Sequence, residues 1–311
     1  MSQRTPRTGT AARARQGTYS IVARDPATGE LGVAVQSHWF SVGPLVPWAI
    51  PGVGAVATQA NIDVAYGPKA LGLLAGGTGA QDALAQLVAQ DLGANGRQVA
   101  IVDARGDVAA HTGEACMPFA GHVTGEQVSC QANIMANDTV WTSMLDGFAG
   151  TTGSLTDRLL AALDAGEAAG GDVRGRQSAA ILVVPAGGQT WETNVSLRVE
   201  DHPEPLEELR RLVRLHDAYV LAGRGDELVN EERHEEAARL YQQAADMAPG
   251  NVELRFWSGL GAAQLGNVEE GAAQVREAIA HQPGWFDLLS RLPREVAPSA
   301  ATVLEHLHQT P

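Results

Sequence analysis

The pattern of apolar residues changes near residue 203, and the change divides the chain into two parts of different class. Before it, short runs rich in β-branched residues alternate with glycine-containing turns and a few amphipathic helices. After it, almost every segment has the spacing of apolar side chains that is typical of a helix. We therefore expect a basic, unstructured tail over residues 1–17, an α/β domain over 18–202 and an all-α domain over 203–311.

The order of elements in the α/β part predicts its architecture. The expected strands are Thr18–Arg24, Leu31–Gln36, Val53–Gln59, Gln98–Asp103, Val108–His111, Val128–Ile134, Gln177–Val184 and Asn194–Val199. The expected helices come in two pairs, Ala65–Leu74 with Gln81–Gln90 and Thr139–Phe148 with Leu155–Ala168. Helix pairs placed between antiparallel strands favour two packed sheets with helices outside them. We expect a four-layer α/β/β/α sandwich.

The all-α part contains a repeat. Pro249 and Pro283 lie 34 residues apart, and small or bulky residues precede them at matching offsets: Gly225, Ala237, Tyr241 and Ala244 before the first, and Gly259, Gly271, Val275 and Ala278 before the second. This spacing resembles the tetratricopeptide repeat, in which small residues let two helices touch. A helix at Pro205–Ala222 is expected to lead in, and one at Ala300–His308 to cap the stack. Two repeats are few to stand alone, so we expect them to pack on the first domain or on a second subunit.

Composition excludes several classes of function. The formal net charge of −14 argues against nucleic-acid binding, which needs clustered Lys and Arg. No apolar run approaches the roughly 20 residues of a membrane helix, and the tail lacks the apolar segment of a secretory signal. The two cysteines, Cys116 and Cys130, are too few to indicate an oxidising compartment, so we expect reduced thiols in a cytoplasmic protein.

No cofactor or metal is expected. The glycines do not match the spacing of a dinucleotide-binding or P-loop motif. His111, Glu114 and Cys116 lack the further ligands that a zinc site requires.

Thr18 stands at the junction between the tail and the first strand, directly after Gly17. A threonine hydroxyl is a weak nucleophile unless a base accepts its proton, and the residue's own α-amine, with a pKa of roughly 8, can do so if the chain begins there. Glycine before it would permit the backbone shape that self-cleavage requires. The alternative is that Gly17 ends a loose tail and Thr18 is an ordinary strand residue.

Four motifs in order resemble one bacterial family. They are Thr18–Asp25 (TYSIVARD), Gly29–Val35 (GELGVAV), Gly52–Gln59 (GVGAVATQ) and Gly175–Ala180 (GRQSAA). The resemblance is to the domain-of-unknown-function family 1028 of the N-terminal-nucleophile hydrolase superfamily, and it spans about residues 18 to 200. It implies the same four-layer sandwich, Thr18 as the nucleophile and the freed amine of Thr18 as the base.

The chain departs from this pattern in two ways. Relatives often begin Met-Thr, whereas here the bond between Gly17 and Thr18 must be cleaved to expose the amine. The lysine that proteasome-type relatives keep on an early strand is also missing, because Lys69 falls on an expected helix.

Polar residues at strand ends are the further candidates for a site. Ser20 lies two residues beyond Thr18 and so on the same strand face, either supporting the nucleophile or bonded to backbone. Gln59 and Asn133 are candidate oxyanion donors. Asn133 lies inside an otherwise apolar strand, where a buried amide needs a hydrogen-bonding role. Gln59 ends its strand, so it also fits a strand-end cap. Ser37 and His38 follow the second strand, where they would bind substrate or form an ordinary loop.

Two further residues are assigned to substrate binding. Asn61 follows the third strand and has the same two interpretations as Gln59. Asp172, Arg174 and Arg176 precede the buried strand that begins near Ser178. An arginine there, assigned as Arg176, would hold a substrate carboxylate by a two-pronged bond, or else an arginine forms a structural ion pair with Asp172.

Two hypotheses follow from these residues. The first is a homo-oligomeric amidohydrolase that acts on a small amide or peptide, with Thr18 freed by loss of residues 1–17. The second is a non-catalytic ligand-binding sandwich whose helical repeats bind a partner.

Overall fold

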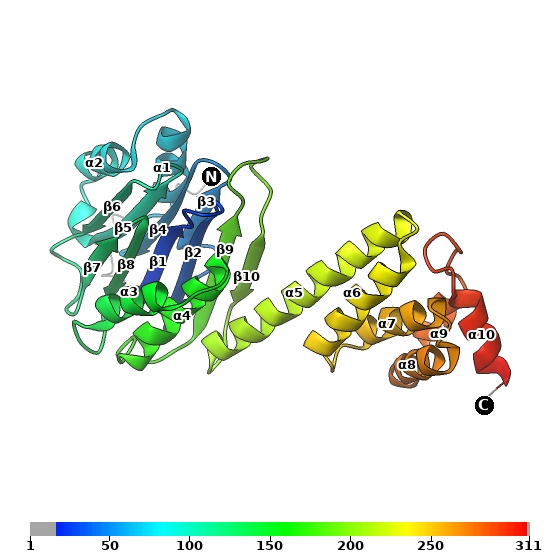
Figure 1. The fold of residues 1–311 in the computed structure, drawn as a ribbon. Helices are drawn as coiled ribbons and strands as arrows, with labels where there is room; N and C mark the ends of the chain where they lie inside the picture. Colours follow the sequence, from blue (N-terminus) through cyan, green and yellow to red (C-terminus); the bar gives the residue numbers. More distant parts are fainter. Residues whose placement is uncertain (1–16, 310–311) are drawn as a thin grey trace, which may run out of the picture. The chain divides into compact units, whose positions relative to one another are not determined.

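The computed structural model describes residues 17–309 (Figure 1). It divides into a unit that ends at Arg210 and a second unit that begins at Arg211, and the division falls within helix α5 (Pro205–Asn230). Except for Gly17, the tail predicted over residues 1–17 lies outside the described residues. Among the residues described, no helix combines the length and the apolar content needed to cross a membrane.

Two antiparallel sheets form the first unit. The larger has the strand order β10-β9-β2-β1-β8-β7 and the smaller the order β3-β4-β5-β6. The strands of the larger sheet are β1 (Thr18–Arg24), β2 (Leu31–Ser37), β7 (Gly121–Gly125), β8 (Val128–Asn133), β9 (Ser178–Val184) and β10 (Val195–Val199). Those of the smaller sheet are β3 (Pro47–Ile50), β4 (Gly54–Ala60), β5 (Arg97–Asp103) and β6 (Val108–Thr112).

Alternation of side chains along the strands determines what each sheet face contacts. Val22, Val33 and Val35 of the larger sheet pack with Ala57 and Val102 of the smaller sheet in one buried cluster. This cluster is the core between the two sheets, and it also explains why β1, β2 and β4 are buried along almost their whole length.

Each sheet is covered by a pair of helices on its other face (Figure 1). Helices α1 (Tyr66–Ala75) and α2 (Ala80–Gln90) pack on the smaller sheet through Leu71, Leu74 and Leu84. Helices α3 (Val140–Gly150) and α4 (Leu155–Ala168) cover the larger sheet, and α4 begins at a capping box in which Ser154 and Asp157 bond each other's backbone. The prediction of a mixed α/β unit is confirmed.

Two strands were not predicted from the sequence. β3 starts with a proline and is only half-buried, and β7 has a glycine at each end and alternates between half-buried and exposed. Both lie at sheet edges, where a strand needs little apolar sequence because only one neighbour pairs with it.

The second unit is built from helices. After α5 come α6 (His234–Met247), α7 (Val252–Gln264), α8 (Val268–His281), α9 (Gly284–Leu289) and α10 (Ala300–Gln309). The prediction that the leading helix stops at Ala222 is wrong, because α5 runs on to Asn230.

Glycines allow neighbouring helices of this unit to approach closely. A Cβ at Gly225 would stand 2.7 Å from the ring of Tyr241, and one at Gly259 would stand 2.7 Å from the carbonyl oxygen of Gly271. Phe256 is fully buried against Trp257 and Trp285 in the core beside these contacts.

Candidate active site around Thr18

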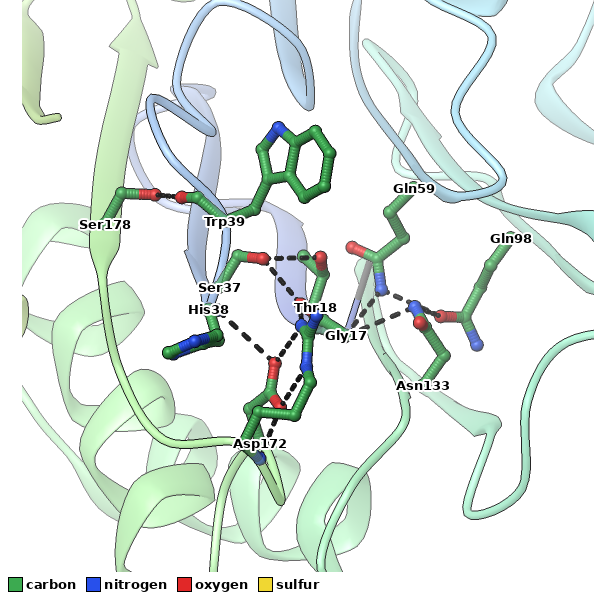
Figure 2. A network of polar contacts seen from close by, with 11 residues as sticks. Gly17, Thr18, Ser37, His38, Trp39, Gln59, Gln98, Asn133, Asp172 and Ser178 are labelled. Carbon is green, nitrogen blue, oxygen red and sulfur yellow. Dashed lines mark hydrogen bonds and ion pairs between the residues drawn. The ribbon is translucent and has the colours of Figure 1, made fainter. Parts of the chain in front are cut away.

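Thr18 begins β1, a strand near the middle of the larger sheet, and is completely buried. Its neighbours across the sheet are Ser37 on β2 and Asn133 on β8. Side chains at alternate positions of β1 share a face of the sheet. Ser20 Oγ donates to Gln59 on β4, so Thr18, two residues before Ser20, lies on the face toward the smaller sheet. The pairing therefore brings three of the polar residues predicted from the sequence to one end of the sheet (Figure 2).

The carbonyl oxygen of Gly17 accepts two hydrogen bonds. Ser37 Oγ donates one over 2.5 Å, and Nη2 of Arg174 donates the other over 3.0 Å. Ser37 Oγ also lies 2.9 Å from Thr18 Oγ1. A hydroxyl carries one proton, so while Ser37 donates to Gly17 the Thr18 hydroxyl is the donor in the pair between them. The Gly17–Thr18 amide thus has a polarised carbonyl next to a hydroxyl whose proton points away from it.

A buried ion pair holds Arg174 in place. The carboxylate of Asp172, which is 0% exposed, accepts hydrogen bonds from Nε and Nη2 of Arg174 over 3.0 and 2.7 Å. The backbone N–H groups of Arg174 and His38 also donate to it. A carboxylate held by this many donors is fixed in position, because moving it would leave a buried charge without partners.

Gly17 lies directly against the side chains of Asp172 and Arg174. A Cβ built on Gly17 would stand 2.5 Å from Asp172 Oδ2 and 2.8 Å from Arg174 Nη2. Any larger residue at position 17 would displace the ion pair, so the structure gives a steric reason for the glycine.

Gln59 and Asn133 lie on the opposite side of Thr18, in a network of buried amides (Figure 2). Their side-chain nitrogens donate to the carbonyl oxygen of Thr18 itself over 3.2 and 3.4 Å, and both donate to Gln98 Oε1 over 2.8 and 3.0 Å. Ser20 Oγ donates to Gln59 Oε1. These side chains orient Thr18, whereas the donors that reach the Gly17 carbonyl are Ser37 and Arg174.

Asn61 and Arg176 lie outside these contacts. The carbonyl of Asn61 accepts a hydrogen bond from Arg97, and its side chain packs beside Gly96. Arg176 pairs with Glu167 and Glu204. The structural ion pair expected between an arginine of this segment and Asp172 is formed by Arg174. His38 contacts the cluster through its backbone N–H, and its ring Nδ1 is buried without a hydrogen-bond partner in the described structure.

Gln98 and Arg174 belong to the cluster but were not among the site residues assigned from the sequence. Gln98 is a fully buried amide inside the apolar strand β5, so the argument made for Asn133 applies to it equally.

Tyr19 lies on the opposite face of β1 and has a different role. Its hydroxyl donates to Glu167 on α4 over 2.6 Å. Burial raises the pKa of Tyr19 well above its usual value, and the negative charge of Glu167 raises it further. Tyr19 therefore stays protonated and anchors the helix layer to the strand that carries Thr18.

Comparison with known proteins identifies the family. Residues 18–209 match the model of a family of unknown function, DUF1028, and the chain belongs to that family. It is also similar to a protein from Silicibacter pomeroyi whose crystal structure carries the same family assignment. The two are 33% identical with a TM-score of 0.59, and the match covers 64% of this chain and 85% of the other. No curated protein matches the chain.

Proposed function

We propose that the first unit is an N-terminal-nucleophile amidohydrolase that cleaves its own Gly17–Thr18 bond and then hydrolyses a small amide or peptide with Thr18. In this proposal the two sheets and their helix pairs are the four-layer α/β/β/α sandwich of that superfamily. The observation that carries the proposal is the pair of hydrogen bonds from Ser37 and Arg174 to the Gly17 carbonyl, beside the Thr18 hydroxyl.

Cleavage begins with attack of Thr18 Oγ1 on the carbonyl carbon of Gly17 through a five-membered ring. Negative charge develops on the Gly17 oxygen, where Ser37 and the Arg174 guanidinium already donate hydrogen bonds. The carbon–nitrogen bond then breaks, the hydroxyl proton ends on the Thr18 nitrogen, and an ester joins Gly17 to Oγ1. Water hydrolyses this ester, and residues 1–17 leave as a carboxylic acid.

The processed chain has the groups that turnover needs. The new α-amine of Thr18, with a pKa of roughly 8, accepts the hydroxyl proton when Oγ1 attacks a substrate amide. Arg174 supplies the positive charge that the missing strand lysine would otherwise supply, since Lys69 is exposed on α1. Gln59 and Asn133 hold the Thr18 backbone and act as positioning residues.

Intact-mass measurement of three purified proteins tests this proposal. The wild-type chain is expected to lose residues 1–17, and Thr18→Ala to retain them because it lacks the attacking hydroxyl. Thr28→Ala is the matched control, since Thr28 is exposed in a turn. Loss of residues 1–17 from Thr18→Ala, or their retention in the wild-type chain, would contradict the proposal.

We also propose that the second unit contains tetratricopeptide-like repeats that bind a protein partner or a second subunit. The close approaches at Gly225 and Gly259 support this proposal, because they occur at matching positions of the two repeats. Size-exclusion chromatography with light scattering tests for a second subunit, because association predicts a measured mass at least twice that of one chain.

A further inference from the structure

The contacts of Gly17 indicate which size of acyl group the site accepts. We propose that the substrate's acyl group is a glycyl group, with no side chain on the carbon next to the scissile carbonyl. This inference rests on the proposed function and deepens it by naming the substrate class.

Self-cleavage and turnover pass through the same kind of ester. Self-cleavage leaves the acyl group of Gly17 as an ester on Thr18 Oγ1, and this ester must be hydrolysed for the chain to mature. A substrate whose acyl end is glycyl forms the same ester linkage when Oγ1 attacks its amide and the amine leaves with a proton. The site therefore completes the second half of turnover on a glycyl group once in the life of every molecule.

The surroundings of Gly17 restrict the size of the acyl group. Gly17 is buried, with its carbonyl oxygen on Ser37 and Arg174 and its α-carbon against Asp172. When residues 1–17 leave, a substrate carbonyl that uses the same two donors puts its own α-carbon in the place of Gly17. A methyl group there would stand 2.5 Å from Asp172 Oδ2 and 2.9 Å from its Cγ, well inside contact distance.

The Asp172 carboxylate is held in place by several donors. The Asp172 carboxylate is 0% exposed and is bound by the Arg174 side chain and by the backbone N–H groups of Arg174 and His38. Retreat of the carboxylate would also pull Arg174 away from the substrate carbonyl. Asp172 is therefore a specificity-determining residue that discriminates between glycyl and larger L-acyl groups.

The test compares two activated esters on the processed protein, N-acetylglycine p-nitrophenyl ester and its N-acetyl-L-alanine counterpart. Release of p-nitrophenolate gives kcat/KM, and intact mass locates the acyl group on Thr18. We expect the glycine ester to react at least about tenfold faster, the discrimination typical of one methyl group in a closed pocket. The Thr18→Ala protein supplies the background rate of reaction elsewhere on the chain.

The outcomes separate this inference from the proposed function. Processed protein that prefers the alanine ester, treats both alike or reacts with neither overturns the inference, while self-cleavage stands. A wild-type chain that retains residues 1–17 refutes the proposed function, and the inference fails with it. As a second variant, Asp172→Gly removes the carboxylate that contacts the acyl group. In the processed form of this variant, the ratio of the two rates is expected to fall toward one.

Discussion

Gly17→Ala is the substitution whose effect on self-cleavage the geometry defines most closely. The added methyl group would lie 2.5 Å from Asp172 Oδ2 and 2.8 Å from Arg174 Nη2, so the ion pair must shift. A shift of Arg174 breaks its hydrogen bond to the Gly17 carbonyl, where negative charge develops during the attack. A hydrogen bond to a charged group contributes about 1.5 to 3 kcal/mol. If the transition state loses that amount, cleavage slows by about 10- to 150-fold.

The assay follows the loss of residues 1–17 by intact mass after synthesis in a cell-free translation mixture. Gly72→Ala is the matched control, because a Cβ at Gly72 meets no atom within 4 Å and cleavage should proceed at the wild-type rate. Combining Gly17→Ala with Asp172→Ala tests the cause, since removal of the carboxylate should reduce the penalty of the first substitution. Wild-type or faster cleavage of Gly17→Ala would refute the steric argument.

Three further predictions concern other parts of the molecule. Ser37→Ala removes a donor from the Gly17 carbonyl and should slow cleavage by about 100- to 1,000-fold in the same mass assay, so an unchanged rate would contradict its role. Asp91→Asn should cost about 1 to 2 kcal/mol in urea unfolding at pH 7. The hydrogen bond from Arg97 lowers the pKa of Asp91 below its ordinary value of 3.8. The contribution of Asp91 to the free energy of unfolding is therefore present above that pH and is lost as the pH falls through the lowered pKa. A cost of Asp91→Asn that persists below the lowered pKa would contradict this. Phe256→Ala should cost about 3 to 5 kcal/mol and speed hydrogen exchange in α7 and α8, whereas unchanged exchange would place Phe256 outside the core.

Much of the first unit could be predicted because its strands are buried and strongly patterned. Both α4 and β1 have the predicted bounds. The Ser154 cap marks the start of α4, and the turn after Arg24 marks the end of β1. β3 and β7 could not be predicted, because their formation depends on pairing with β4 and β8 and not on their own apolar pattern. α5 continues past the glycine at 225 because helix packing against Tyr241 outweighs the glycine's low helix propensity.

The site was predicted in part, for reasons that individual residues make clear. Alternation along β1 and strand pairing bring Thr18, Ser37 and Asn133 together, and the sequence contains enough information for this. Which donor reaches which carbonyl depends on the loop after α4, and no local pattern determines that Arg174 rather than Arg176 pairs with Asp172. The steric demand on Gly17 comes from residues 155 and more positions away, so only three-dimensional structure could provide it.

The most direct test of the account is capture of the ester on Thr18. Freshly synthesised chain is incubated with hydroxylamine, which attacks esters much faster than amides, and the released peptide is identified by mass. The account predicts residues 1–17 ending in a hydroxamate at Gly17, together with a chain that begins at Thr18 with a free amine. Release of that peptide only as a carboxylic acid, or no release at all, would contradict an ester intermediate and with it the role of Thr18 as the nucleophile.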